Sequence, residues 1–169
     1  MKRYSLILLM LAFVFMSSYV KAGEGAKKSF EKIKSLAGEW QGKGPKGKSV
    51  SVTYEVVSNG SVVMERMQSE NEPAMITMYH LDSGYLMMTH YCSAMNQPRM
   101  RATSSDDETI IQFAFLDITN LAKPTDGHME KLMIKFKDQD HLATQWTFIE
   151  DGKEMNAPFE LERKKMSTK

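Results

Sequence analysis

Short segments in which apolar and polar residues alternate fill almost the whole chain after Gly38. They are rich in Val, Ile, Thr, Tyr and Phe, and stretches of Gly, Asn, Asp, Ser and Pro separate them. Alternation with a period of two is typical of half-buried β-strands, and the separating residues are typical of tight turns. The pattern predicts about ten strands, at residues 39–44, 48–57, 61–69, 74–82, 85–92, 99–104, 109–116, 129–137, 141–149 and 154–163.

This order of elements predicts an all-β fold, a single antiparallel up-and-down barrel. Tight turns join strands that follow one another in the chain, so the sheet is a meander. A meander leaves two unpaired edges, which closure into a barrel removes. The sequence shows no internal repeat that would indicate a propeller or a solenoid, and an open β-sandwich is the alternative architecture. A long loop is expected only at residues 119–126.

A short helix is predicted before the first strand. Phe30, Ile33 and Leu36 recur at three-residue spacing with charged residues between them, which gives the segment one apolar face. Ser29 is the expected N-cap of this helix. Residues 23–28 precede it and are expected to be a flexible start.

Residues 1–22 have the layout of a secretory signal peptide. A short basic segment precedes an apolar run over residues 6–16, and small and polar residues lead to an expected cleavage site after Ala22. The apolar run is about half of the roughly 20 residues that a membrane span needs, so no stable membrane anchor is expected. We therefore predict an exported protein, periplasmic or secreted, with one barrel domain at residues 23–169.

Composition narrows the possible functions. The formal net charge is +1, with acidic and basic residues mixed along the chain, so no nucleic-acid partner is expected. Cys92 is the only cysteine, which excludes a disulfide within the chain. The sequence has no glycine-rich phosphate loop, no Gly-x-Ser-x-Gly elbow and no His-Glu-x-x-His helix, which argues against the enzyme classes that use them.

Directly after the predicted helix lies the segment 36–44, with the sequence LAGEWQGKG. It resembles the Gly-x-Trp opening of the calycin superfamily, which contains the lipocalins and fatty-acid-binding proteins. Its Gly-x-Trp-x-Gly-x-Gly form resembles the nitrobindin-type haem barrels. The resemblance implies that a helix covers one barrel end, that Trp40 begins the first strand, and that an arginine of the last strand packs on the indole. Residues 78–100 resemble a set of uncharacterised exported bacterial proteins, which implies no activity.

The last predicted strand supplies a candidate for this arginine. One face of residues 155–163 is apolar and ends on Arg163. Arg163 is therefore expected to stack on Trp40 by a cation–π contact that closes the barrel. Nitrobindin-type barrels bind haem through a histidine near the C-terminal end of the barrel. The last strand here has no histidine and the nearest one upstream is His141, so no haem or other cofactor is predicted.

Residues 74–92 predict a hairpin that turns on residues 83–84. A two-residue turn sets Tyr79 opposite Met88 and fixes the rest of the register. The more apolar face of this hairpin is expected to point into the barrel. That face carries Met75, Thr77, Tyr79, Leu81, Leu86, Met88, His90 and Cys92.

The candidate ligand-binding residues are Tyr79, Met88, His90, Cys92 and Arg101. They place a few polar groups in an apolar wall, as small-molecule pockets do, and Arg101 is expected to hold an anionic group. Other roles of His90 stay open. It either hydrogen-bonds Thr77 or Tyr79 inside a filled core, shares a soft metal ion with Cys92, or acts as a general base.

We expect a lipocalin-like binding protein that sequesters a small, partly apolar ligand in the barrel interior. No catalytic residue and no metal site are predicted. Two other functions stay open. One is a barrel enzyme that uses His90 as its general base, and the other is a filled barrel that acts through its outer surface or the loop at residues 119–126.

Overall fold

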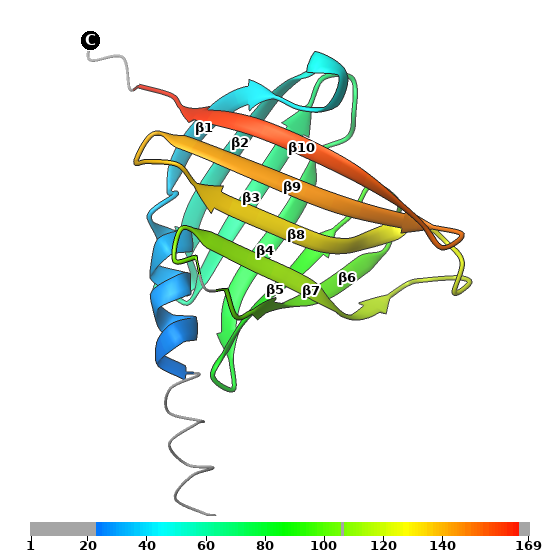
Figure 1. The fold of residues 1–169 in the computed structure, drawn as a ribbon, viewed down its shortest axis with the longest axis horizontal. Coiled ribbons are helices and arrows are strands. Elements are labelled where there is room, and N and C mark those ends of the chain that lie inside the picture. Colours follow the sequence, from blue (N-terminus) through cyan, green and yellow to red (C-terminus); the bar gives the residue numbers. More distant parts are fainter. Residues whose placement is uncertain (1–22, 106, 166–169) are drawn as a thin grey trace, which may run out of the picture.

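The computed structural model describes residues 23–105 and 107–165. The signal peptide predicted at residues 1–22 lies outside the described residues. The described chain forms β1 (Gly38–Lys43), β2 (Ser49–Val57), β3 (Val62–Ser69), β4 (Met75–Asp82), β5 (Tyr85–Tyr91), β6 (Gln97–Thr103), β7 (Ile110–Thr119), β8 (His128–Phe136), β9 (His141–Glu150) and β10 (Lys153–Arg163) (Figure 1). Every predicted strand is present, with bounds that differ by at most a few residues.

The strands form one closed antiparallel barrel in which each strand pairs with its neighbours in the chain. Strand β1 also pairs with β10, which joins the first strand to the last. The register sets Trp40 opposite Arg163 and Gly42 opposite Leu161. The predicted up-and-down barrel is therefore confirmed, and the open sandwich is excluded because a closed sheet has no free edge.

One helix, at residues 23–34, covers one end of the barrel (Figure 1). Phe30, Ile33 and the following Leu36 are at most 3% exposed and belong to the barrel core. They are the three apolar residues from which the helix is predicted. Because these side chains fill the barrel end, the helix is part of the core.

The predicted start of this helix is wrong. Residues 23–28 are helical, so Ser29 lies inside the helix and cannot be its N-cap. Ala26 packs against the core one helical turn before Phe30, which extends the apolar face beyond the predicted start. No helix among the described residues is long and apolar enough to cross a membrane.

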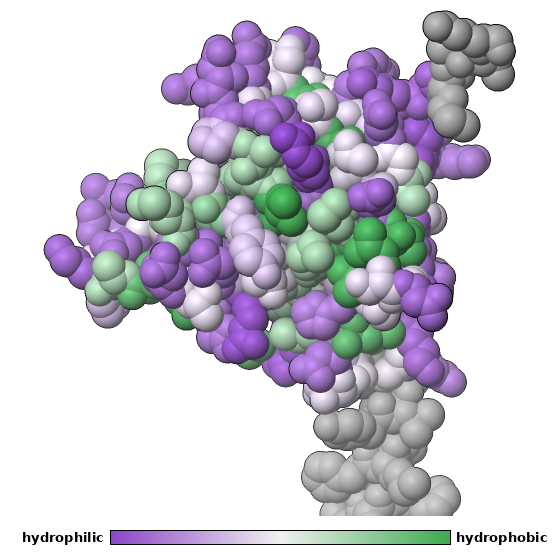
Figure 2. Space-filling model, turned by 180° about the vertical axis from the view of Figure 1, so that it is seen from behind, coloured by the Kyte–Doolittle hydropathy of each residue, from purple (hydrophilic) through white to green (hydrophobic). Residues whose placement is uncertain are grey.

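Alternation along each strand separates an inner from an outer face of the barrel wall. On β2, Val50, Val52 and Tyr54 are buried, whereas the residues between them are exposed. The outer face is nevertheless partly apolar. Met64 on β3 pairs with Met78 on β4 on the outer face, and both are half-buried. Figure 2 views the barrel from behind and shows hydrophobic residues at the surface among hydrophilic ones.

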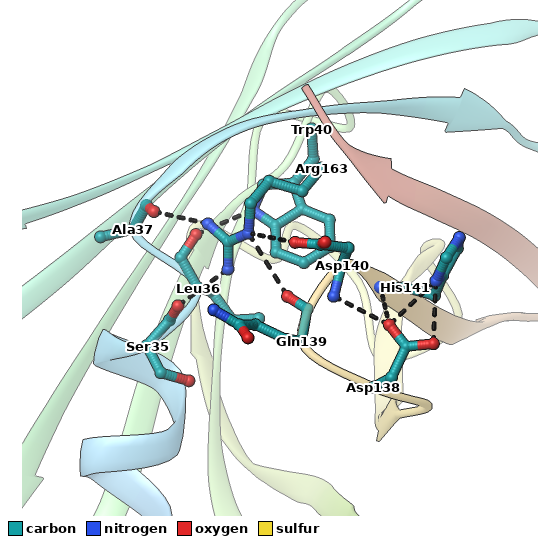
Figure 3. A network of polar contacts seen from close by, with 9 residues as sticks. All are labelled: Ser35, Leu36, Ala37, Trp40, Asp138, Gln139, Asp140, His141 and Arg163. Carbon is teal, nitrogen blue, oxygen red and sulfur yellow. Dashed lines mark hydrogen bonds and ion pairs between the residues drawn. The ribbon is translucent and has the colours of Figure 1, made fainter. Parts of the chain in front are cut away.

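Contacts of one arginine close the barrel at the helix end (Figure 3). The Arg163 guanidinium lies over the Trp40 indole, with 4.3 Å between its central carbon and the ring centroid. Its Nη1 donates to the Ala37 carbonyl at 2.8 Å, and its Nη2 donates to the Ser35 carbonyl at 3.0 Å. The Trp40 indole Nε1 donates to the Leu36 carbonyl at 2.8 Å. The stacking predicted for Arg163 and Trp40 is thus present.

The same guanidinium also reaches the turn between β8 and β9. Its Nε donates to the Gln139 carbonyl at 3.3 Å and lies 3.4 Å from the Asp140 carboxylate (Figure 3). The carbonyls that follow the helix have no intrahelical donor, and a cation at this helix end is favoured by the helix dipole. Arg163 therefore joins the helix end, β1 and the β8–β9 turn.

Two glycines of the segment 36–44 leave room for this closure. A Cβ at Gly42 would lie 1.8 Å from the Glu160 carbonyl oxygen, where β1 pairs with β10. Gly38 has a φ of +126°, a conformation that favours glycine, and a Cβ there would lie 3.2 Å from Nη1 of Arg163. The glycine spacing of this segment follows from the close approach of the first and last strands.

Replacing Arg163 with Met should lower the free energy of unfolding by about 3 kcal/mol. The variant keeps an unbranched apolar stem but loses the charge-assisted hydrogen bonds and the cation–π contact. Urea unfolding followed by circular dichroism measures the change. Lys164→Met is the matched control, because it breaks only an exposed ion pair with Glu39, which is worth about 1 kcal/mol or less. Equal losses in the two variants would contradict the closing role of Arg163.

Candidate functional site

A cavity of about 310 Å³, here called the mouth cavity, opens at the end of the barrel opposite the helix. Its wall is apolar and carries Met67, Met75, Met129, Ala157 and Phe159. His90 and Trp146 also line it, and they are the most buried of its lining residues, at 2% and 3% exposed. The mouth cavity therefore extends from the surface to the barrel interior.

Charged residues surround the entrance of the mouth cavity. Lys46 and Lys48 come from the β1–β2 turn, and Glu72 comes from the β3–β4 turn. Lys48 and Glu72 form an ion pair of 2.7 Å, whereas Lys46 makes no ion pair with any described residue. The cavity thus combines an apolar wall with a charged rim.

Two further hollows lie on the outside of the barrel. One, of about 840 Å³, is a broad hollow over the outer faces of β1, β2 and β10 and is lined mostly by exposed polar residues. The other, of about 510 Å³, lies between the helix and strands β5 to β7. Neither of them contains one of the sequence-predicted ligand residues, so the mouth cavity is the candidate site.

His90 is the most buried of the residues that line the mouth cavity. Its Nδ1 lies 3.0 Å from the Thr77 hydroxyl, and its ring packs 4.5 Å from the Trp146 ring. Its Nε2 is buried and has no hydrogen-bond partner among the described residues. Burial lowers the pKa of His90 to about 4, so the imidazole is neutral near pH 7.

Glu65 is a buried carboxyl group, only 3% exposed, on the inner face of β3. The Tyr79 hydroxyl donates to it at 2.7 Å, and Tyr54, its cross-strand partner on β2, also hydrogen-bonds to it. Burial raises the pKa of Glu65 to about 6, although both tyrosines stabilise its charged form. No basic side chain pairs with Glu65 in the described part of the chain.

Glu65 and His90 lie in one row across the inner face of the barrel, because Glu65 is opposite Thr77 and Thr77 is opposite His90. Burial and the Glu65 charge raise the pKa of Tyr79, the donor to Glu65, well above its ordinary value. The Thr77 hydroxyl and Nδ1 of His90 form a hydrogen bond whose direction depends on the tautomer of the imidazole.

The sequence-predicted ligand residues do not all lie in the same part of the structure. The hairpin register is as predicted, with Tyr79 opposite Met88 and Thr77 opposite His90. Tyr79 and Met88 are fully buried inside the barrel but do not line the mouth cavity. Cys92 is half-buried in the turn after β5 and does not line it either. Of the predicted set, the mouth cavity contains His90.

The prediction for Arg101 is wrong. Met100 is fully buried opposite Met88, so alternation turns Arg101 to the outer face of β6. There its guanidinium lies over the Tyr85 ring, 4.7 Å from the centroid. Arg99 on the same outer face pairs with Asp117. Strand β6 therefore supplies no arginine that could bind an anionic group in the barrel interior.

Sequence reasoning missed Glu65, and it missed the cavity wall around Met67 and Met129. On β3, each face carries two apolar and two polar residues, so alternation alone cannot decide which face is inside. The register of the neighbouring strands would have shown which face of β3 points inward. Glu65 lies opposite Tyr54 and Thr77, and Thr77 was predicted to face the barrel interior.

The residues present do not fit haem in the way that the nitrobindin resemblance implies. Strand β10 carries no histidine. His141 is 57% exposed at the helix end of the barrel, where it pairs with Asp138. His90, the histidine of the mouth cavity, comes from β5. Among the described residues, no group of three or more His, Cys, Asp or Glu side chains is placed to hold a metal ion.

Comparison with known proteins shows a similar fold in other proteins but indicates no function. A protein of unknown function from the DUF3598 family of Nostoc punctiforme superposes with a TM-score of 0.54 and 11% identity over 78% of this chain, which spans 49% of that protein. Rv2717c from M. tuberculosis superposes with a TM-score of 0.54 and 16% identity, over 80% of this chain and 96% of that one. Such identities show a shared barrel fold alone. No protein-family model and no curated protein sequence matches the chain.

Glu65→Gln should raise the free energy of unfolding by about 2 kcal/mol at about pH 7.5 and leave it unchanged near pH 4. The folded-state pKa of about 6 lies above the ordinary value of 4.5. The ionised carboxylate therefore destabilises the fold above about pH 6, and this destabilisation disappears below about pH 4.5, where both states are protonated. Urea unfolding at the two pH values measures the difference.

The matched control is Glu55→Gln, which changes an exposed carboxylate on the neighbouring strand. Its effect should be within about 0.5 kcal/mol at both pH values. A Glu65→Gln variant that is less stable than the parent protein at about pH 7.5 would contradict the buried, unfavourable charge.

Proposed function

We propose that the protein is an exported, lipocalin-like binding protein that holds one small, partly apolar molecule in the mouth cavity. The observation that carries this proposal is a cavity with an apolar wall and one unpartnered buried polar atom, Nε2 of His90. Ligand sites usually combine an apolar wall with a few placed polar groups. The export rests on the signal-peptide layout of residues 1–22.

The size and wall of the mouth cavity define the ligand class. Its volume of about 310 Å³ is at the lower end of the roughly 300–1,000 Å³ typical of small-molecule sites. Thioether and aromatic side chains such as Met67, Met129 and Phe159 supply adaptable apolar contacts. The ligand is therefore a compact molecule whose larger part is apolar.

Two groups orient the ligand. Nε2 of His90 has no hydrogen-bond partner among the described residues, so the buried end of the ligand carries a polar group, such as a hydroxyl, that forms a hydrogen bond with it. Lys46 at the rim has no ionic partner among the described residues, so an anionic or polar group at the outer end fits there. Lys46 takes the orienting role that the sequence suggested for Arg101.

Binding is favoured over catalysis by the state of His90. A general base is most effective when its pKa lies near the working pH, and burial lowers the pKa of His90 to about 4. The imidazole is therefore a weak base at pH 7 but a competent hydrogen-bond acceptor. The presence of the mouth cavity also favours ligand binding over a filled barrel that acts through its surface.

Ala157→Phe should weaken binding of the apolar probe 1-anilinonaphthalene-8-sulfonate by at least about tenfold, a loss of about 1.4 kcal/mol. Ala157 lines the mouth cavity, and a phenyl group there fills space that the probe needs. Fluorescence titration measures the affinity, and native mass spectrometry of the protein from its producing cells detects a retained ligand.

Ala143→Phe is the matched control for this substitution. Ala143 lies on the outer face of β9 between Lys135 and Glu160, and it is half-buried like Ala157. The control should bind the probe as the parent protein does. A parent protein that binds no probe, or equal affinity in the two variants, would remove the support for a ligand in the mouth cavity.

A further inference from the structure

Three methionines from three strands line the mouth cavity together with His90. Met67 on β3 and Met75 on β4 are direct cross-strand partners on the inner face, so their Cβ atoms are about 5 Å apart. Met75 lies two residues from Thr77, the partner of His90, and so neighbours His90 diagonally. Met129 comes from β8 and lines the same cavity. Three thioether side chains and one imidazole therefore line one cavity.

The hydrogen bonding of His90 is compatible with a role as a metal ligand. Histidines that bind metals use one ring nitrogen for the ion and donate the other N–H to a fixed acceptor. His90 lines the cavity, and its Nδ1 lies 3.0 Å from the Thr77 hydroxyl. Its Nε2 is buried and has no hydrogen-bond partner among the described residues.

A buried acidic group lies near the inner end of the mouth cavity, whereas Lys46 and Lys48 are at its rim. Glu65 is buried without a basic partner in the described chain. It lies opposite Thr77, which lies opposite His90, so about 10 Å, twice the strand spacing, separates the Glu65 and His90 backbones. The Trp146 ring, 4.5 Å from the His90 ring, presents a face that also attracts cations.

We propose that the mouth cavity binds one soft monovalent metal ion, Cu(I) or its analogue Ag(I), through Nε2 of His90 and the sulfurs of Met67, Met75 and Met129. Thioethers are soft ligands that select Cu(I), and imidazole is compatible with it. Zn(II) sites combine several thiolate, imidazole or carboxylate ligands, and Ca(II) and Mg(II) prefer oxygen ligands. Among the residues that line this cavity, His90 is the one imidazole and Glu72, the one carboxylate, is paired with Lys48. This metal site goes beyond the organic ligand proposed above and does not depend on it.

Cu(I) transfer from its coloured bicinchoninate complex, under reductant and without oxygen, tests the site. The titrations use the Cys92→Ser background, because the half-buried thiol is itself a soft ligand. The parent of this series should take up one equivalent of Cu(I). Replacing both Met67 and Met75 with Leu should weaken uptake by at least about tenfold, since even outer-shell partners of metal sites typically contribute that much.

The same two strands supply a matched control. Met64 and Met78 form the equivalent cross-strand pair on the outer face of β3 and β4, and their double replacement with Leu should leave Cu(I) uptake unchanged. Met129→Leu provides an independent single variant if the inner double variant does not fold. Leu keeps the volume and apolar character of Met, so circular dichroism should show a folded barrel in each case.

The outcomes separate this proposal from the proposed function. The Cys92→Ser protein should bind 1-anilinonaphthalene-8-sulfonate as the parent protein does, because Cys92 does not line the mouth cavity, so this titration tests the organic-ligand proposal separately from Cu(I) uptake. Native mass spectrometry with Ag(I) should show one added silver ion in the Cys92→Ser protein and none in the inner variants. Absence of Cu(I) uptake, or equal uptake by the inner and outer double variants, would overturn the metal site and leave the organic-ligand proposal standing.

Discussion

The stacking of Arg163 on Trp40 is the contact on which the enclosed interior depends. Strands β1 and β10 are the two ends of a meander, and each would expose a row of unpaired backbone groups if they did not meet. The same guanidinium holds the carbonyls that follow the helix. Closing the sheet and covering one barrel end are therefore coupled, and the mouth cavity lies at the opposite end.

The interior of the barrel is more polar than stability alone would favour. A well-packed apolar core is usually at least as stable as one with buried ionisable groups. Here the interior contains two hydrogen-bonded pairs, Tyr79 with Glu65 and Thr77 with His90, and Nε2 of His90 has no partner among the described residues. The ionisation of Glu65 and His90 opposes folding at opposite ends of the pH range, because burial raises the pKa of one and lowers that of the other. This arrangement is typical of binding sites, which often contain residues that lower the stability of the fold.

Most of the fold is predictable from the sequence, because strand alternation and turn residues act locally. The 74–92 hairpin shows this, since a two-residue turn fixes its whole register. The candidate site is less predictable, because its wall joins strands far apart in the chain, such as β3 and β8. Arg101 was assigned to the interior because a guanidinium suits an anionic ligand, although alternation along β6 puts it on the outer face with Arg99, opposite to the buried Met100. The helix start was missed because Ala26 is too small an apolar residue to mark a face alone.

The contact of Arg163 with the helix end also determines when the barrel can close during folding. The Arg163 side chain bonds to a carbonyl 126 residues earlier in the chain, so the contact spans nearly the whole domain. Contacts between distant residues form late, because the intervening chain must first lose its conformational freedom. During synthesis on the ribosome, β1 therefore has one unpaired edge until β10 has been translated. The barrel completes its folding only after translation of its last strand, and until then the open edge of β1 is a site for mispairing and for capture by a chaperone.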